Sequence, residues 1–490
     1  MSLINRNDTL MVWFMARPPI LRALILLAIV FAVVAAGVVV YSLINHTFID
    51  LLLVFRDLAV LAYMFFLRIG VPVILVVGIG AWLKRKLDPD EERAGQPLSE
   101  RVPMLQRVKL PRLSSRLILG LTFVAALWTA AIGLAIARFL FGLSYVTNLN
   151  DSYPWGLWIS FDVICGVALA AGGFVMAGTA HVFNMKRFHP IVRPAILTAF
   201  LGYLLVVVGL LFDLGRWYQM LNVFTMINIH SPMIEVAWCV ILYTTVLTLE
   251  FSPVVFEKFN LQVPLKIIRR ITVPLVIAGM CLSTLHQSTL GTLFLIAPEK
   301  INPLWYSPLL PVFFFISAVA VGLGMTIVES NLSARFLGQE LESDLLASLG
   351  KAASIVLLVY FLLKVADLIA RGATAYLTVP GIHSTLYWIE MGLGVVIPML
   401  ILSTKRGRET PRTLFATGWL IVGGVILNRF NTSMLGWWSY ASGGPVYIPT
   451  LSEVTITISL ITLGVVAFAV IGKFFPIFVK EHQHAQAPAE

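Results

Sequence analysis

The stretch Leu282–Pro311, LSTLHQSTLGTLFLIAPEKINPLWYSPLLP, decides how the rest of the chain is interpreted. It begins inside an apolar run typical of a transmembrane helix, and it carries His286 and Gln287 among several hydroxyl groups at membrane depth. It then continues into a loop rich in Pro and Trp. Polar side chains at that depth are costly, so they are usually retained for a reason. The Ser and Thr residues fit simple helix packing, whereas we interpret His286 beside Gln287 as part of a functional site.

The composition is that of a membrane protein. Of 490 residues, 59% are hydrophobic and only 12% are charged, about half the charged fraction of a soluble protein. Repeated apolar runs of about 20 residues predict an all-α polytopic membrane protein. The net charge of +10 does not indicate nucleic-acid binding, because the basic residues gather at helix ends. The three cysteines lie in apolar runs without metal-ligand spacing, so we expect no iron–sulfur cluster and no metal site in this chain.

The hydrophobic pattern predicts about 12 transmembrane helices. Two spans, residues 23–43 and 57–83, precede a charged linker at 84–116. The ten core spans are predicted at residues 116–141, 157–181, 192–213, 231–252, 271–295, 309–330, 348–370, 384–404, 413–430 and 452–474. We therefore divide the chain into an N-terminal two-helix extension with its linker (1–112), a ten-helix core (113–478) and a disordered cytoplasmic tail (479–490).

Lys and Arg set the orientation, because cytoplasmic loops carry an excess of them. They cluster in the N-terminal segment, in the linker, and in the turns containing Lys186, Arg187 and Arg193, then Lys266, Arg269 and Arg270, then Lys405, Arg406, Arg408 and Arg412. All of these fall on one face, so we expect both termini in the cytoplasm and the protein in a bacterial inner membrane. The opposite loops are rich in Trp, Tyr, Pro and Gly. They form either an aromatic belt or a structured outer surface that covers a ligand or docks a partner.

Titratable side chains gather in the outer half of the predicted spans. They are Asp162, Asp213, Glu235, His286, Lys364, Asp367, Arg371, Glu390 and Arg429. Isolated charges there cost at least a few kcal/mol, so they should form pairs or line a wet cavity. Some have a purely structural alternative: Asp213 with Arg216 and Asp367 with Arg371 could be ion pairs, and Glu235 and Arg429 could reach the headgroups. In the inner half, Glu250 and Glu329 are candidates for a proton path, with Lys364 as an intermediate step.

An amphiphilic redox ligand with a polar ring and an apolar tail suits this arrangement. A b-type haem would need two axial histidines on facing helices. The candidates are His181, His230, His286 and His383, and no two of them share a suitable depth. We therefore expect no haem.

Seven segments together resemble the polysulfide reductase/NrfD-type membrane subunits, with the hydrogenase-2-type [NiFe] hydrogenases as the nearest branch. They are DSYPWGLWISFD (151–162), RFHPIVRPA (187–195), FDLGRWYQ (212–219), LEFSPVVFE (249–257), LHQSTLGTL (285–293), NPLWYSPLLP (302–311) and YWIEMGLG (387–394). The resemblance covers about residues 117–475, and residues 1–112 lie outside the common pattern.

The resemblance implies a haem-free NrfD-like helical bundle that binds a quinone, menaquinone or ubiquinone, near its periplasmic face. A ferredoxin-like iron–sulfur subunit would dock there, with [NiFe] hydrogenase small and large subunits or a multihaem cytochrome beyond it. Some relatives are thought to translocate protons. The quinone-binding or proton-transfer candidates are Trp155, Trp158, Asp162, Asp213, Arg216, Glu235, His286, Gln287 and Glu390; the possible proton path comprises Glu250, Glu329, Lys364, Asp367 and Arg371.

Two other functions remain open from the residues. A secondary transporter would place its charges near the midplane of two repeated halves, but the charges here gather at one face and the sequence shows no clear repeat. A haem b cytochrome subunit is the other alternative, and the depths of the histidines disfavour it.

Overall fold

The structure is a computed structural model, and it describes residues 115–182, 185–226, 228, 231–296, 298–339, 341–437 and 447–478. Within that part, nine helical segments are long and apolar enough to cross a membrane. They are Leu119–Phe141, Trp158–Val182, His189–Asp213, Pro232–Lys258, Leu310–Leu337, Ser343–Ala370, Ile382–Ser403, Pro411–Trp437 and Leu451–Phe474. The protein is therefore a multi-pass helical membrane protein, as its sequence predicts.

These nine segments correspond to nine of the ten predicted core spans. The remaining prediction, residues 271–295, falls on helix α10 (Gln262–Thr292), which is not among the nine. Helix α10 runs back along α9 (Pro232–Lys258) after a short turn and packs between α9 and α11 (Leu310–Leu337), so it is part of the bundle. The two predicted N-terminal spans, the linker and the tail lie outside the described residues.

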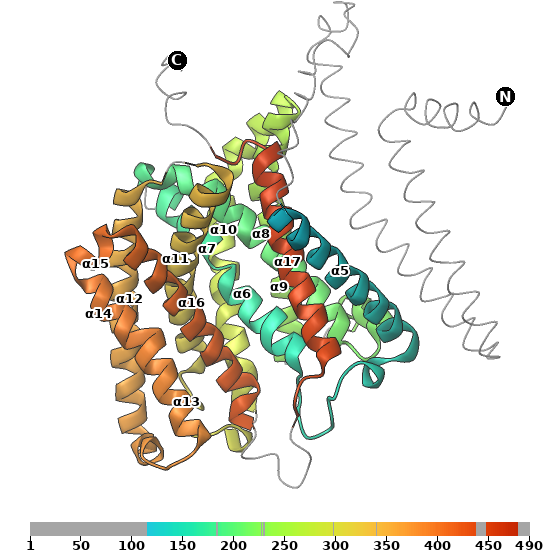
Figure 1. Cartoon of the computed structure of the whole chain (residues 1–490), viewed down its shortest axis with the longest axis vertical. Coiled ribbons are helices and arrows are strands. Elements are labelled where there is room, and N and C mark those ends of the chain that lie inside the picture. Colours follow the sequence, from blue (N-terminus) through green and yellow to red (C-terminus); the bar gives the residue numbers. More distant parts are fainter. Residues whose placement is uncertain are drawn as a thin grey trace, which may run out of the picture. The chain divides into compact units, whose positions relative to one another are not determined.

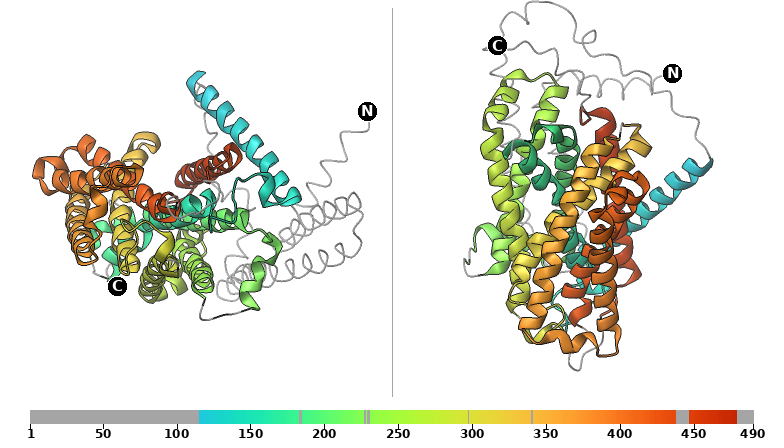
Figure 2. Two further views of the ribbon diagram at one scale, coloured as in Figure 1. Left: turned by 90° about the horizontal axis from the view of Figure 1, so that it is seen from below. Right: turned by 90° about the vertical axis from the view of Figure 1, so that its left-hand side faces the viewer.

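The helices form two groups of four, each running up and down across the bundle (Figures 1 and 2). The first helix group consists of the segment Trp158–Val182, α8 (His189–Asp213), α9 and α10. The second helix group consists of α11, α12 (Ser343–Ala370), the segment α13–η10–α14 (Ile382–Met391, Gly392–Val396, Ile397–Ser403) and α16 (Pro411–Ser433). Helix α5 (Ser115–Phe141) packs against α17 (Leu451–Phe474), and α17 packs against α8.

The segment Trp158–Val182 lies at the centre and is the most deeply buried of the nine. It is irregular: the π-helix η3 (Trp158–Cys165) leads into α6 (Gly166–Leu169), and a turn at Ala170 and Ala171 separates α6 from α7 (Gly172–Ala177). A second π-helix, η4 (Gly178–Val182), ends it. Irregular backbone at membrane depth is tolerated where it is buried in protein, and π-helical turns are frequent at functional sites.

Short elements join these helices. They are the 3-10 helices η2 (Leu143–Tyr145), η5 (Lys186–Phe188), η6 (Trp217–Phe224), η7 (Leu293–Ile296), η8 (Pro298–Lys300), η9 (Ala373–Leu377) and η11 (Leu435–Trp437), and the short helix α15 (Lys405–Glu409). We name the bundle end that holds Trp155, Trp305 and Trp437 the aromatic end, and the end that holds the turns at 258–262 and 404–410 the basic end.

The aromatic end is held together by side chains of the connecting loops. The Tyr447 phenol donates to Glu453 at the start of α17 and accepts from the Leu157 N–H at 2.8 Å. The Glu453 carboxylate also accepts from the N–H groups of Thr450 and Asn148, at 2.8 and 3.2 Å. Burial, followed by the hydrogen bond to Glu453, raises the pKa of Tyr447. The loop before Trp158 is thereby attached to α17.

Two glycines bring α16 into direct backbone contact with η10. A Cβ atom added at Gly424 would lie 2.3 Å from the Cα of Gly394, which is far below any real contact distance. The adjacent Gly423 faces open space, with nothing within 4 Å of an added Cβ.

We therefore expect Gly424→Val to destabilise the protein while Gly423→Val does not. The added methyl groups must push two helices apart, and such overpacking costs about 1–3 kcal/mol. Thermal unfolding of the purified protein in mild detergent measures the difference. Equal melting temperatures of the two variants would show that this helix contact is not tight.

Candidate functional site

The predicted outer constellation is divided by the structure into three clusters. The His286 cluster lies in the first helix group, the Glu390 cluster lies in the second, and the Asp162 cluster lies where η3 meets α8 and α17. Each brings together residues from different spans, and each is described separately below.

The His286 cluster lies between α8, α9 and α10. His286 and Gln287 are fully buried, at 0% exposure. The His286 Nδ1 atom is 2.9 Å from the Tyr203 hydroxyl, and the Gln287 amide donates to the Val167 carbonyl of α6 at 2.9 Å. The other polar atoms of the pair, His286 Nε2 and Gln287 Oε1, have no hydrogen-bond partner among the described residues. Buried polar atoms are nearly always paired, so these two require an explanation.

Further hydroxyl groups extend this cluster toward the basic end. The Tyr243 ring contacts the Tyr203 ring edge to face, with 4.6 Å between centroids. The Ser283 hydroxyl lies beside both tyrosines. One turn further along α10, a Cβ atom at Gly279 would lie 3.2 Å from Glu250 Oε1 and 3.6 Å from the Tyr243 ring. Glu250, Tyr243, Ser283, Tyr203 and His286 thus follow one another along the inside of the first helix group.

The Glu390 cluster satisfies a fully buried carboxylate with three N–H donors. Glu390 is 1% exposed, and it accepts from Trp305 Nε1, Asn428 Nδ2 and Asn431 Nδ2, each at 2.8 Å. The Asn428 Oδ1 atom accepts from Arg429 at 2.8 Å.

Arg429 is itself 0% exposed. It donates to the Phe314 carbonyl and the Ser317 hydroxyl of α11, at 3.0 and 2.9 Å, and its guanidinium lies 3.7 Å from the Phe314 ring centroid. Arg429 therefore does not reach the headgroups, the alternative that its sequence position left open. The cluster joins α11, α13 and α16 around a small hollow that Tyr360 and Glu390 also line.

Lys364, Asp367 and Arg371 lie on α12 and at its end, as predicted. Arg371 forms an ion pair with Asp367 at 2.7 Å, so the structural pairing considered for them is present. Asp367 also accepts from Ser307 at 2.7 Å. Lys364 is 1% exposed, and its ammonium lies 4.7 Å from the centroid of the Phe313 ring.

The Asp162 cluster lies on the π-helix η3. Asp162 is buried and accepts from Thr457 of α17 at 2.9 Å, and Gly209 of α8 leaves room for it: a Cβ there would lie 2.6 Å from the Asp162 Cβ. At the end of α8, Arg138 of α5 donates to the carbonyls of Phe212 and Leu214.

Asp213 lies near Arg138 rather than near the partner considered for it. Among the described ion pairs none joins Asp213 to Arg216, whose side chain is exposed. Arg138 caps the α8 carbonyls instead, because the last carbonyl groups of a helix lack partners within it.

The remaining predicted residues take separate positions. Glu235 is exposed and accepts from Thr289 at 2.7 Å, and Glu329 accepts from Thr198 at 2.6 Å. Trp155 packs against Phe294 and Trp437, with centroids 5.3 and 6.1 Å apart, and Trp158 packs against Phe212 at 5.6 Å.

Sequence reasoning missed the partners of these residues. For Asn428 and Asn431 a signal existed: the segment LNRFNTS near the end of an apolar run resembles LHQST in type. Tyr203, Tyr243 and Thr457 gave no signal, because a single hydroxyl group in an apolar run is common. Trp305 was noticed only as part of an aromatic loop.

The comparisons with known proteins agree on one family. The model of the family described as "Polysulphide reductase, NrfD" matches residues 145–435. A protein of Nitratidesulfovibrio vulgaris (strain Hildenborough) is 38% identical over 363 residues, 72% of this chain and 93% of the relative. The "Probable Ni/Fe-hydrogenase 2 b-type cytochrome subunit" of Escherichia coli (strain K12) is 31% identical over 359 residues, 72% and 91% respectively. The "Menaquinone reductase, integral membrane subunit" of N. vulgaris is 26% identical over 369 residues, 69% and 86%.

The E. coli relative is named as a b-type cytochrome subunit, which raises the question of whether the described histidines of this chain fit a haem. His181 and His189 touch edge to face, 4.9 Å between ring centroids, which leaves no room for a porphyrin between them. His286 belongs to the first helix group and His383 to the second. The pair in contact therefore does not fit a haem held between two histidines; His230 lies outside the described residues. Groups of three or more metal-ligating side chains are absent from the described part as well.

We expect Glu390→Gln to destabilise the protein by about 3 kcal/mol. The substitution replaces one acceptor oxygen by an NH2 group, which then faces the N–H donors of Trp305, Asn428 and Asn431. Thermal unfolding in mild detergent measures the loss. Glu409→Gln, a change of the same kind at an exposed residue of α15, is the control. Similar melting temperatures for both variants would contradict a structural role of this carboxylate.

Proposed function

Because the chain belongs to the NrfD family, we propose that it is the quinone-reactive membrane subunit of an oxidoreductase complex. It exchanges electrons between an iron–sulfur subunit at its aromatic end and menaquinone or ubiquinone in the membrane. The names of two relatives, a menaquinone reductase subunit and a hydrogenase subunit, support this reading. The protein supplies position and protons, while the quinone and the partner's clusters supply the redox chemistry.

The observation that carries the proposal is the pair of buried, partnerless polar atoms His286 Nε2 and Gln287 Oε1. A quinone oxygen accepts a hydrogen bond, and the hydroxyl group of the quinol donates one. An imidazole nitrogen and an amide oxygen on consecutive residues offer both functions at one place. Leu290, one turn further along α10 and 1% exposed, adds an aliphatic side chain that suits the apolar part of such a ring.

The hydrogen bond with Tyr203 determines which ring nitrogen of His286 carries the proton. When the Tyr203 hydroxyl donates to Nδ1, Nε2 carries a proton; Nε2 can give this proton to a quinone oxygen while Nδ1 takes the proton of Tyr203, which is reprotonated through Ser283 and Tyr243. In the reverse direction Nε2 accepts a proton from a quinol hydroxyl, Nδ1–H gives its proton to the Tyr203 oxygen, and Tyr203 passes its own proton on along the same hydroxyl groups. The pair can therefore pass a proton in either direction, depending on the direction of electron flow.

The proton route we propose begins at Glu250. Its carboxylate, the Tyr243 and Ser283 hydroxyls and the Tyr203 hydroxyl lead along the inside of the first helix group to His286. The unpartnered hydroxyl oxygens of Tyr243 and Ser283 suit bridging waters. Glu329 with Thr198, and Lys364 with Asp367 and Arg371, offer the alternative path considered from the sequence.

The aromatic end is the proposed docking surface for a ferredoxin-like iron–sulfur subunit, with [NiFe] hydrogenase subunits or a multihaem cytochrome beyond it. The hydrogen bonds of Tyr447 and Glu453 give this end a defined shape. Asp162, Asp213, Arg216, Glu235 and Glu390 remain candidates for quinone contact or proton transfer on this side, and Trp155 and Trp158 are candidates for the wall.

We expect His286→Ala and Asp162→Asn to lower quinone-dependent turnover at least about 100-fold, because removal of a positioned proton donor or acceptor typically costs that much. The complex is purified through this chain in mild detergent, and mass spectrometry of the same preparation shows whether an iron–sulfur subunit accompanies it. Ser288→Ala is the matched control on α10, since Ser288 bonds only to the Thr284 carbonyl. Turnover at the wild-type rate in either variant would refute the assignment of that residue, and purification of the chain alone would remove the proposed electron path.

We also expect the protons for quinone reduction to come from the basic end. The complex is reconstituted in vesicles with its partner outside and a pH dye inside. Turnover should make the interior alkaline, and Tyr203→Phe and Glu250→Gln should slow this at least about tenfold. Tyr360→Phe is the control, because Tyr360 occupies the matching place on α12, about three turns from the aromatic end. If Glu329→Gln abolished the interior alkalinisation while Glu250→Gln kept the wild-type rate, the proton route would pass through Glu329 and not through Glu250.

A further inference from the structure

Four cationic residues flank the turn between α9 and α10. Lys258 ends α9, and Lys266, Arg269 and Arg270 lie in the first part of α10. All four side chains belong to exposed residues. We name these residues and the turn between them the basic hairpin.

The basic hairpin reaches beyond the hydrocarbon region of a bilayer. Helix α10 has 31 residues and is about 46 Å long, whereas the hydrocarbon core is about 30 Å thick. Figures 1 and 2 show the hairpin projecting past the neighbouring ends of α11 and α17. Its cationic side chains are therefore placed at the level of lipid headgroups.

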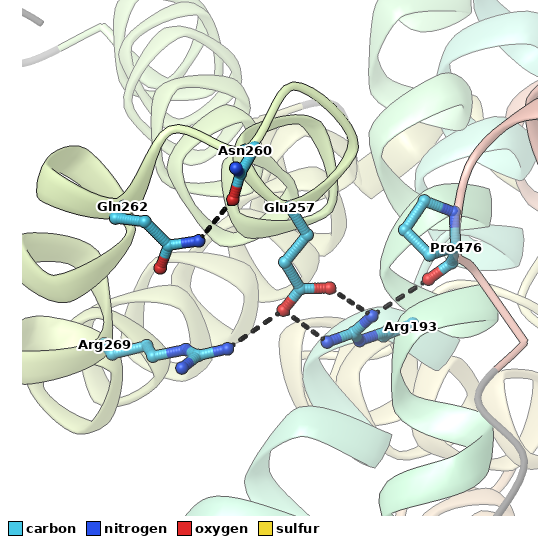
Figure 3. Close-up of polar contacts among 6 residues, drawn as sticks. All are labelled: Arg193, Glu257, Asn260, Gln262, Arg269 and Pro476. Carbon is cyan, nitrogen blue, oxygen red and sulfur yellow. Dashed lines mark hydrogen bonds and ion pairs between the residues drawn. The ribbon is translucent and has the colours of Figure 1, made fainter. Parts of the chain in front are cut away.

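The acidic residue beside Lys258, Glu257, is already occupied. Glu257 accepts two hydrogen bonds from Arg193 of α8, at 2.8 and 2.9 Å, and one from Arg269 at 3.2 Å (Figure 3). Arg193 also donates to the Pro476 carbonyl at 2.9 Å, which attaches the segment after α17. Lys258, Lys266 and Arg270 have no ion-pair partner in the part of the chain that the structure describes.

Exposed apolar side chains continue the basic face of α10 toward the membrane centre. Lys266, Arg270, Val273 and Ile277 follow one another at spacings of three or four residues, so they share one helix face. Val273 is 47% and Ile277 46% exposed. Cations at headgroup level above a strip of aliphatic side chains match a lipid with an anionic headgroup and two acyl chains.

We propose that the basic hairpin binds an anionic phospholipid, with its phosphate at Lys266 and Arg270 and an acyl chain along Val273 and Ile277. This site is separate from the proposed quinone site and does not depend on the proposed function. An acidic protein segment would satisfy the cations but not the apolar strip below them, so the lipid is the better match. The bound lipid would tie the free end of the α9–α10 pair to the bilayer surface.

The test uses the full chain, purified with its partners in mild detergent and then stripped of lipid. Added phosphatidylglycerol should raise the melting temperature, and phosphatidylcholine should not. Lys266→Gln with Arg270→Gln should weaken the response to phosphatidylglycerol roughly 30-fold in concentration, the change for two cationic contacts with an anionic surface. Native mass spectrometry should show a retained phosphatidylglycerol in the wild type and not in this variant.

Two control variants make the outcome decisive. Lys266→Arg with Arg270→Lys keeps the charge and should keep the response. Arg406→Gln with Arg412→Gln removes the same charge from another exposed part of the basic end, and it should also keep the response. The proposal is overturned if the wild type shows no preference for phosphatidylglycerol, or if both charge-removing variants lose it equally, since the effect would then be a general surface charge and not a site.

Discussion

A carboxylate within the membrane is stable only if its charge is met by donors, and Glu390 shows how completely this chain meets that requirement. Its two oxygens receive three N–H groups from a loop tryptophan and two asparagines of α16, and the neighbouring Arg429 donates to α11 and Asn428 through its two terminal nitrogens. At this buried position the loss of any one of these hydrogen bonds leaves a polar group unpaired, which lowers the stability of the folded protein. Because the donors come from different helices, the same bonds fix α11, α13 and α16 relative to one another. The second helix group is thus organised around this network, although Arg429 Nε and Asn431 Oδ1 have no hydrogen-bond partner among the described residues.

The first helix group has a related arrangement. His286 and Gln287 occupy a position on α10 that corresponds to that of Asn428 and Arg429 on α16, and Tyr203 corresponds to Tyr360. His286 Nε2 and Gln287 Oε1 have no partner among the described residues, and Arg429 Nε has none either. A buried network with unpaired hydrogen-bonding atoms destabilises the protein unless a ligand or water supplies the missing partners. The first helix group differs in that two consecutive residues offer an imidazole nitrogen and an amide oxygen without partners, which is the reason for proposing ligand binding there. The repeated four-helix arrangement also explains why the sequence showed no repeat: the shared feature is the position of polar residues, and their identities differ.

Hydropathy predicted the membrane spans well, since it depends only on the one-dimensional order of the chain. Nine spans were found at the predicted places, and Asp367 with Arg371 pair as their spacing allows. Depth could be read in the same way, so Glu390, His286 and Asp162 were recognised as buried polar residues. The side of the helix could not be read, because packing of small residues such as Gly394 against Gly424 decides which faces meet. For that reason the sequence suggested one constellation where the structure has three clusters, and it paired Asp213 with Arg216 instead of placing it near Arg138.

The irregular helices explain how side chains so close in sequence come to serve different clusters. In a regular α-helix residues three and four apart share a face, but the π-helix η3 adds about one residue to each turn. Asp162 thereby faces Gly209 and Thr457, whereas Cys165 of the same element is within 3.9 Å of the Ile426 carbonyl on α16. One element contacts both α17 and the second helix group, and Val167 just beyond it accepts from Gln287 of the first. The central segment Trp158–Val182 therefore contacts elements of all three clusters, and its π-helical turns are the least regular part of its backbone.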